Sequence, residues 1–157
     1  MVFDVLAIGD TTIDAFIRLK DARVTCDVNE ENCMLGMRFG DKIPYEFVEI
    51  VPAVGNAANA AVAVAKLGLN VTARLHVGAD ENGKVCIETL KKAGVDTSLM
   101  VTESGKKTNY HYVLWYESER TILLKHEIFS YSFPKLTEAP KWIYLSSVGE
   151  GTESYHD

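Results

Sequence analysis

The segment VGNAANAAVAVAKLGL, residues 54–69, joins a glycine break to a run rich in alanine. Alanine is the strongest helix former, so we predict a helix over residues 56–67. Gly68 follows it as a suitable C-terminal stop. Small side chains on every face would let this helix approach a sheet or a ligand closely.

The segments on either side of this run are predicted to be strands and one further helix. Residues 3–8 are an apolar run closed by Gly9 and Asp10, which is typical of a buried parallel strand. The other elements we expect are a half-exposed strand at 11–19, a strand at 71–77, a helix at 81–93 with Val85, Ile87, Leu90 and Ala93 as its apolar stripe, and a buried strand at 141–147. Alternation of strands with helices predicts an α/β fold with a parallel sheet and helices on its faces.

A second group of segments alternates apolar and polar residues without intervening helices. Residues 43–51 form one such strand, and residues 108–116 with 120–126 form a hairpin. Residues 20–42 are polar and irregular. We interpret residues 12–51 as strands of a small sheet that stands off the main body, within one domain spanning residues 1–157.

Composition limits the class of protein. The chain has 157 residues, 47% of them apolar, which suits a single globular domain with a sizeable core. A net charge of −6 argues against a nucleic-acid surface. No apolar run approaches the ~20 residues that span a bilayer. The start of the chain has Asp4 and no basic region, so we expect neither a signal peptide nor a membrane partner, but a cytoplasmic location.

Cysteine and histidine spacing gives no metal signature. The chain has three cysteines, Cys26, Cys33 and Cys86, and an odd count without an export signal favours reduced thiols. Cys26 and Cys33 are not at a usual zinc spacing. We therefore expect no metal site in this chain.

The junction VGNAAN supplies the first candidate binding residues, Gly55, Asn56 and Asn59. Glycine permits a tight turn, and the first turn of the helix has free N–H groups at its positive end. Asn59 offers donors and an acceptor, as a polyhydroxylated ligand requires. Taken alone, the segment is better explained by Asn56 capping the helix and Asn59 lying on its surface.

Asp14 and Glu150 are candidates because of their place in the sheet. Ligands of open α/β sheets bind beyond the carboxyl ends of the strands, and Asp14 follows such an end within a few residues. Its carboxylate could accept two sugar hydroxyls. Glu150 follows the strand at 141–147 and should reach the same edge. From position alone, Asp14 and Glu150 could equally be solvent-exposed residues without a binding role.

Two further segments have patterns that could bind a ligand. The segment GADENG, residues 78–83, has the glycine spacing of a dinucleotide-binding turn, but it follows a later strand, so Asp80 more simply caps the next helix. Aromatic residues alternate along the hairpin. Some of them should pack against the sheet, and one, Tyr112, could stack on a ligand.

Five segments in this order resemble the PfkB family of carbohydrate kinases: FDVLAIGDTTID, VGNAANAAVAVAKLG, VGADENG, TNYHYVLWYESERTILL and KWIYLSSVGEG. The resemblance implies a ribokinase-like three-layer fold with a protruding β lid, made by segments near 12–51 and 106–128. It also implies that Asp14, Gly55 and Asn59 contact the sugar and that the loop of Glu150 adds a substrate contact. Val54 departs from the family, which normally has glycine there, and residues 20–42 exceed a minimal lid.

The family's second signature, a GAGD-type run with the catalytic aspartate, is not in this sequence. The resemblance then implies that the chain is the amino-terminal, substrate-binding part of an ATP-dependent sugar or nucleoside kinase that transfers the γ-phosphate to a substrate hydroxyl. No catalytic residue is expected here, the ATP and Mg²⁺ sites should lie mainly in a carboxyl-terminal half, and the chain alone should be inactive.

Further expectations concern partners and rivals. The resemblance adds a small sugar or nucleoside as ligand and a homodimer through the lid sheet. The alternative is a non-catalytic sugar-binding or oligomerisation module. A dinucleotide-binding domain would need a glycine-rich turn after the first strand, and GDTTID does not supply one.

Overall fold

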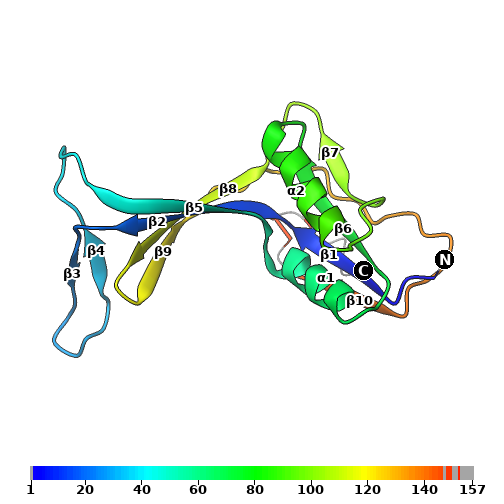
Figure 1. Ribbon diagram of the computed structural model, residues 1–157, viewed down its shortest axis with the longest axis horizontal. Helices are drawn as coiled ribbons and strands as arrows, with labels where there is room; N and C mark the ends of the chain where they lie inside the picture. The colour runs from blue at the N-terminus through cyan, green and yellow to red at the C-terminus, as the bar shows by residue number, and fades with distance from the viewer. Residues whose placement is uncertain (1, 147, 150–151, 153–157) are drawn as a thin grey trace. The chain divides into compact units, whose positions relative to one another are not determined.

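The computed structural model describes residues 2–146, 148–149 and 152 (Figure 1). The chain divides into two compact units: unit 1 comprises Met1–Ile13, Pro52–Tyr110 and Lys125–Asp157, and unit 2 comprises Asp14–Val51 and His111–Leu124. The elements in chain order are β1 (Val5–Asp10), β2 (Thr12–Leu19), β3 (Arg23–Thr25), β4 (Met34–Gly36), β5 (Tyr45–Val54), α1 (Asn56–Lys66), β6 (Val71–Gly78), α2 (Glu81–Lys92), β7 (Val101–Glu103), β8 (Asn109–Tyr116), β9 (Glu119–Leu123) and β10 (Trp142–Leu145).

Unit 1 is built on a parallel sheet in the order β10-β1-β6-β7. β1 lies between β10 and β6, and its register with β6 ends on the pair Asp10 and His76. Both helices are drawn over this sheet in Figure 1, and they belong to one apolar cluster with its strands. The predicted α/β fold with a parallel sheet is confirmed.

Alternate residues of the central strands form that core. The apolar cluster takes alternate residues of β6 together with the alanines of α1 and two residues of α2: Val71, Ala73, Leu75, Val77, Ala57, Ala58, Ala61, Cys86 and Leu90. The alanines allow α1 to lie very close to β1, since a Cβ added at Gly9 would stand 2.7 Å from the Cβ of Ala57.

Two predictions about packing in unit 1 were wrong. The expected stripe of α2 is correct for Leu90, which is buried, and for Ile87, which packs against the core, but it is wrong for Val85, which is 46% exposed, because Gly83 and Cys86 face the sheet instead. The strand at 141–147 was expected to be buried, yet Trp142 is 73% exposed. β10 stands at an edge of the sheet, where apolar side chains lack a covering layer among the described residues.

Unit 2 contains a sheet in the order β5-β2-β8-β9. The predicted hairpin is present as β8 and β9, paired antiparallel from Tyr112 opposite Leu123 to Tyr116 opposite Glu119. Arg18 of β2 lies over the ring of Trp115, 4.6 Å from its centroid, and donates to the carbonyl of Glu117 at the hairpin turn. These contacts join β2 to the tip of the hairpin.

A two-stranded sheet, β3 paired with β4, completes unit 2. A disulfide joins Cys26 to Cys33 across the loop between these strands, so the expectation of reduced thiols was wrong for this pair. Cys86 is a free, buried thiol. Acidic residues gather at the loop tip, where Asp27, Glu30 and Glu31 are exposed.

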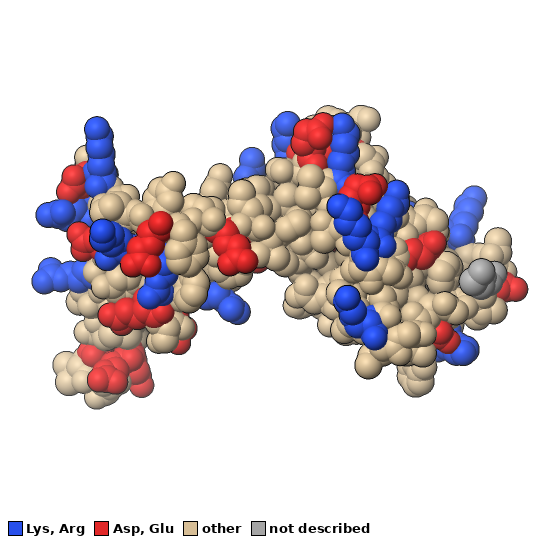
Figure 2. Space-filling view, viewed as in Figure 1, with Lys and Arg blue, Asp and Glu red and all other residues tan. Residues whose placement is uncertain are grey.

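Elsewhere on the face shown in Figure 2, Lys and Arg side chains are interspersed with Asp and Glu. No helix among the described residues is long and apolar enough to cross a membrane.

Candidate functional site

The carboxyl ends of β1 and β6 place two ionisable side chains together. Asp10 and His76 are register partners on adjacent parallel strands, so their side chains project from the same face of the sheet. They are 5% and 1% exposed. This face is opposite to the one that α1 and α2 cover, because Leu75 and Val77, which flank His76, belong to the helix-side core.

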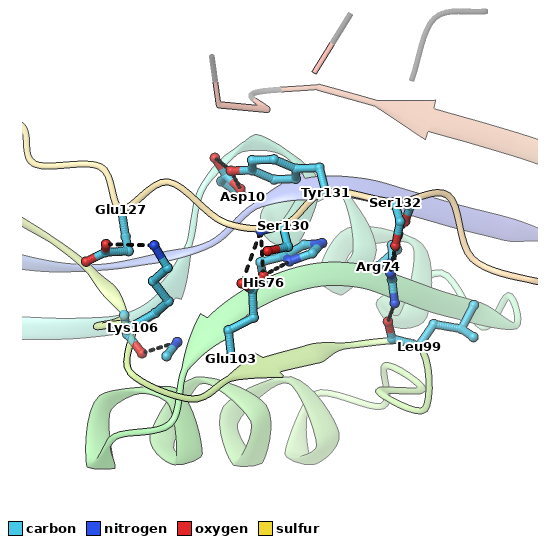
Figure 3. Close-up of polar contacts among 12 residues, drawn as sticks. Asp10, Arg74, His76, Leu99, Glu103, Lys106, Glu127, Ser130, Tyr131 and Ser132 are labelled. Carbon is cyan, nitrogen blue, oxygen red and sulfur yellow. Dashed lines mark hydrogen bonds and ion pairs between the residues drawn. The ribbon is translucent and has the colours of Figure 1, made fainter. Parts of the chain in front are cut away.

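A segment without regular structure, Glu127–Ser132, crosses this face, and we call it the strap (Figure 3). Glu103 of β7 accepts the backbone N–H of Ser130, at 2.8 Å to Oε1 and 3.1 Å to Oε2. Arg74 of β6 donates to the carbonyl oxygen of Ser132 at 2.9 Å. The strap is therefore held by charged side chains of two neighbouring strands.

Tyr131, between these two anchors, points its hydroxyl at Asp10. The hydroxyl lies 2.7 Å from Oδ1 and 2.9 Å from Oδ2 of the carboxylate (Figure 3). Burial raises the pKa of Asp10, and the hydrogen bond from Tyr131 opposes that shift. A buried carboxylate at a strand end, held by a phenol, is typical of a functional site.

His76 is paired on its other side. Its Nδ1 lies 2.9 Å from Oε1 of Glu103, and its Nε2 is buried without a hydrogen-bond partner among the described residues. Burial lowers the pKa of His76 although Glu103 opposes the shift, which favours a neutral ring that donates from Nδ1. The ring also lies beside Tyr131, with ring centroids 4.8 Å apart.

The loop before α1 reaches the same end of β1. Gly55 has φ of 117°, and a Cβ added there would stand 2.8 Å from the carbonyl oxygen of Asp10. Only glycine fits both this conformation and this approach. Asn56 is the first residue of α1, and its Nδ2 lies 3.3 Å from Oγ of Ser146, after β10. The N-cap position is Gly55, so Asn56 is not the helix cap.

Asp14 lies in unit 2, on β2. Its Oδ1 is 3.3 Å from Nδ1 of His111, an ion-pair distance, yet this buried oxygen accepts no hydrogen bond among the described residues. Burial raises the pKa of Asp14, with His111 and Arg120 opposing. An acceptor that is buried and lacks a donor is costly, unless a ligand supplies the donor.

Asp14 shares its strand face with Phe16, two residues on. Phe16 lines a groove of unit 2 together with Glu49, Trp115 and Arg120. An aromatic groove with charged side chains at its edge suits a ligand that has both apolar C–H faces and hydroxyls. Tyr112, the other predicted residue of this unit, is 50% exposed on β8.

The structure thus places Gly55 and Asn56 with Asp10 in unit 1, and Asp14 and Tyr112 in unit 2. Asn59 is exposed on α1. Glu150 lies outside the described residues. Sequence reasoning missed Asp10, although it ends the first strand directly, where a ligand-facing residue is expected. It also missed Tyr131, because the strap has no periodic pattern that would signal its position.

No group of three or more His, Cys, Asp or Glu side chains within residues 2–146, 148–149 and 152 could hold a metal ion.

Solved structures that match this fold include two ribokinases and a nucleoside kinase. Ribokinase from Cryptococcus neoformans, in complex with ADP, matches with a TM-score of 0.65 and 24% identity over 90% of this chain and 39% of its own. Arabidopsis thaliana ribokinase, complexed with ribose and ATP, matches with a TM-score of 0.63 and 19% identity over 80% of this chain and 36% of its own. A nucleoside kinase from Methanocaldococcus jannaschii matches with a TM-score of 0.61 and 17% identity over 77% of this chain and 36% of its own.

The similarity to these kinases defines a ribokinase-like fold. A model of the pfkB family carbohydrate kinases matches residues 49–149, and the chain belongs to this family. A search of curated proteins gave no match. The chain spans between 36% and 39% of the lengths of the three solved structures.

Proposed function

We propose that this chain forms the acceptor-binding part of an ATP-dependent sugar or nucleoside kinase. Asp14 carries the proposal, because its buried Oδ1 has no hydrogen-bond donor among the described residues while lying on the strand that follows β1. A substrate hydroxyl would supply that donor. The family match supports the reaction class, and the ribose and ATP named for the plant ribokinase support the substrate class.

The other predicted residues take supporting roles in this proposal. Gly55 brings backbone close to Asp10, and Asn56 and Asn59 offer amide groups on the first turn of α1. Tyr112 and the loop of Glu150 would add contacts, and the segments near 12–51 and 106–128 would act as a lid that excludes water. Phosphoryl transfer depends mainly on positioning and on stabilising charge, so binding the acceptor in a fixed pose is a substantial contribution.

ATP, Mg²⁺ and the catalytic base are assigned to residues beyond this chain, since the printed sequence has no GAGD-type run. We therefore expect the 157 residues alone to be inactive. Dependence on ATP favours the cytoplasm as the site of the reaction.

The test uses the intact protein that carries this chain. It is incubated with ATP, Mg²⁺ and, in turn, D-ribose, D-fructose, 2-keto-3-deoxygluconate and adenosine, and products are weighed by mass spectrometry. We expect one acceptor to gain a phosphoryl group. Asp14→Asn should lower kcat/KM for that acceptor about 10- to 100-fold, the loss for hydrogen bonds to a charged group.

Asp41→Asn is the matched control, since Asp41 is an exposed carboxylate of the same unit, paired with Arg38 at 3.0 Å. It should leave kcat/KM unchanged. Absence of an ATP-dependent product with every acceptor would overturn the proposal and favour a non-catalytic sugar-binding module.

We also propose a homodimer through the sheet of unit 2. Val48 and Ile50 are 42% and 59% exposed, and because they are two residues apart on β5 they project from the same face of this sheet. Exposed apolar side chains that share a sheet face can mark an interaction surface. Ile50→Lys should convert the dimer to a monomer by light scattering, whereas a monomeric wild type would contradict the proposal.

A further inference from the structure

The position of Tyr131 is determined by contacts on both sides of it. Ser130 is bound through its N–H to Glu103, and Ser132 through its carbonyl to Arg74. Glu127, at the start of the strap, donates its N–H to Oδ1 of Asn109 at 2.7 Å. With the backbone fixed on each side, the Tyr131 side chain has little freedom to leave Asp10.

The ring itself is also enclosed. A Cβ added at Gly149 would stand 2.8 Å from the Tyr131 hydroxyl oxygen and 3.3 Å from its ring. Any side chain at position 149 would push the hydroxyl away from Asp10. On its other side the ring contacts His76, and the 4%-exposed Phe129 packs edge-on to it with centroids 6.4 Å apart. Such enclosure is what a preorganised binding group requires.

The bond to Tyr131 leaves Asp10 with capacity to bind more. An ionised carboxylate has about four acceptor positions, and the phenol supplies one hydrogen shared between two oxygens. Asp10 is 5% exposed, and among the described residues the ionisable side chains that act on it electrostatically are the imidazoles of His76 and His126 rather than a Lys or Arg. A further hydroxyl donor at this carboxylate would therefore be favourable.

Asp10 is also adjacent to the predicted substrate loop, because Gly55 approaches its carbonyl oxygen. Asp10 thus contacts the loop of Gly55 through its backbone carbonyl and Tyr131 through its side-chain carboxylate.

We propose that Tyr131 is a positioning residue of the acceptor site: its hydroxyl orients the Asp10 carboxylate so that Asp10 can accept a hydroxyl of the bound sugar. The inference rests on the proposed function, and it adds Asp10 as a ligand-binding residue and Tyr131 as the group that acts through it. The rival is a purely structural role, in which the Tyr131–Asp10 bond only fastens the strap to the sheet.

The experiment measures binding of D-ribose, D-fructose, 2-keto-3-deoxygluconate and adenosine to the intact protein by calorimetry without ATP, and turnover with ATP separately. Tyr131→Phe keeps the ring and removes the hydroxyl. We expect the Kd of the bound acceptor to rise about tenfold and the KM for ATP to stay constant, as for one lost hydrogen bond to a charged group. Tyr144→Phe is the control, since Tyr144 is a 41%-exposed tyrosine of unit 1.

A double-mutant cycle separates the two roles. If Tyr131 acts through Asp10, Tyr131→Phe should change the acceptor Kd less than twofold once Asp10→Asn is present. Independent tenfold effects in the cycle would overturn the inference. A fall in stability of Tyr131→Phe with an unchanged acceptor Kd would also overturn it, because that is the result of a structural tether alone.

The outcomes distinguish this inference from the proposed function. If Tyr131→Phe weakens acceptor binding but the wild type forms no phosphorylated product, the inference is supported and the kinase activity is overturned. Product formation with equal binding by wild type and Tyr131→Phe supports the kinase and overturns the inference. Neither binding nor product overturns both.

Discussion

Thr108 donates to both carboxylate oxygens of Asp80, from Oγ1 to Oδ1 at 2.6 Å and from its backbone N–H to Oδ2 at 3.1 Å. Oδ1 also accepts the N–H of Gly83, which makes Asp80 the N-cap of α2, as the sequence predicted. One carboxylate thus fastens the start of the segment leading into β8 to the helix. Burial alone would raise the pKa of Asp80, but these hydrogen bonds lower it below its ordinary value.

Removing this carboxylate should destabilise unit 1. Asp80→Ala loses the helix cap and two bonds from Thr108, so we expect the free energy of unfolding in urea to fall by about 3 kcal/mol. Because the pKa of Asp80 is lowered by folding, its contribution is present at neutral pH and is lost as pH falls through the folded pKa. Glu88→Ala, at an exposed site on α2, is the control and should cost under about 0.5 kcal/mol.

Gly55→Ala should be more damaging than an alanine at another glycine with positive φ. At Gly55 an alanine would be strained by the φ of 117° and would also stand 2.8 Å from the Asp10 carbonyl oxygen. We therefore expect the free energy of unfolding to fall by about 3 kcal/mol. Gly105→Ala is the matched control, because Gly105 has φ of 77° but nothing within 4 Å of an added Cβ, and it should cost about 1 kcal/mol. Equal losses in urea unfolding would show that the contact with Asp10 is unimportant.

Thiol labelling should distinguish the cysteines. Burial raises the pKa of the Cys86 thiol to about 11, so iodoacetamide should leave it unmodified in the folded chain. Without reductant no label is expected; after mild reduction Cys26 and Cys33 should both react, and Cys86 only after denaturation. Labelling of Cys26 and Cys33 before reduction would contradict the disulfide.

Reduction should loosen the β3–β4 hairpin rather than the whole chain. Its two strands are short and largely exposed, and closing the loop between the cysteines stabilises it by about 2.5 kcal/mol in the chain-entropy account. Hydrogen exchange of residues 23–36 should accelerate on reduction while β1 and β6 stay protected.

Acidification should weaken the fold through His76. Its pKa is lowered because folding buries the ring, so the unfolded chain binds the proton more readily, and the free energy of unfolding should fall as pH drops below about 6.5. Burial would raise the pKa of Glu103, but hydrogen bonds from His76 and Ser130 lower it below its ordinary value. Protonation of Glu103 therefore also reduces the free energy of unfolding, at lower pH than His76. Asp10, with its raised pKa, acts in the opposite direction.

The measurement is an NMR titration of the His76 ring together with urea unfolding at pH 7.5 and 5.5. We expect the midpoint for His76 below that of the unfolded chain and lower stability at the acidic pH. A midpoint above the unfolded value would contradict the buried neutral ring.

Local patterns were sufficient to predict much of the fold. The alanine run predicted α1, the apolar run before Gly9 predicted β1, and Asp80 was expected to cap α2. Each of these depends on residues close together in the chain. The burial of Cys86 in place of Val85 could not be predicted, because the face that α2 turns to the core is fixed only once the sheet beneath it is in place.

The same limit applies to the candidate site. Gly55 could be singled out because glycine before an alanine helix is a local signal. The bond from Tyr131 to Asp10 joins residues 121 positions apart, and neither the strap's irregular sequence nor its polar residues indicate which strand it crosses. Burial of Asp10 and His76 follows from that crossing, so it too was beyond reach of a single sequence.

The position of β1 between β6 and β10 has a consequence during synthesis of the chain. β1 is made first, but the residue paired with Val5 on one side is Trp142. At about 5–20 residues per second, that edge of β1 stays unpaired on the ribosome for on the order of ten seconds after it emerges. A nascent chain of this protein should therefore be a substrate for chaperones that shield open strand edges until Trp142 and its neighbours have been added.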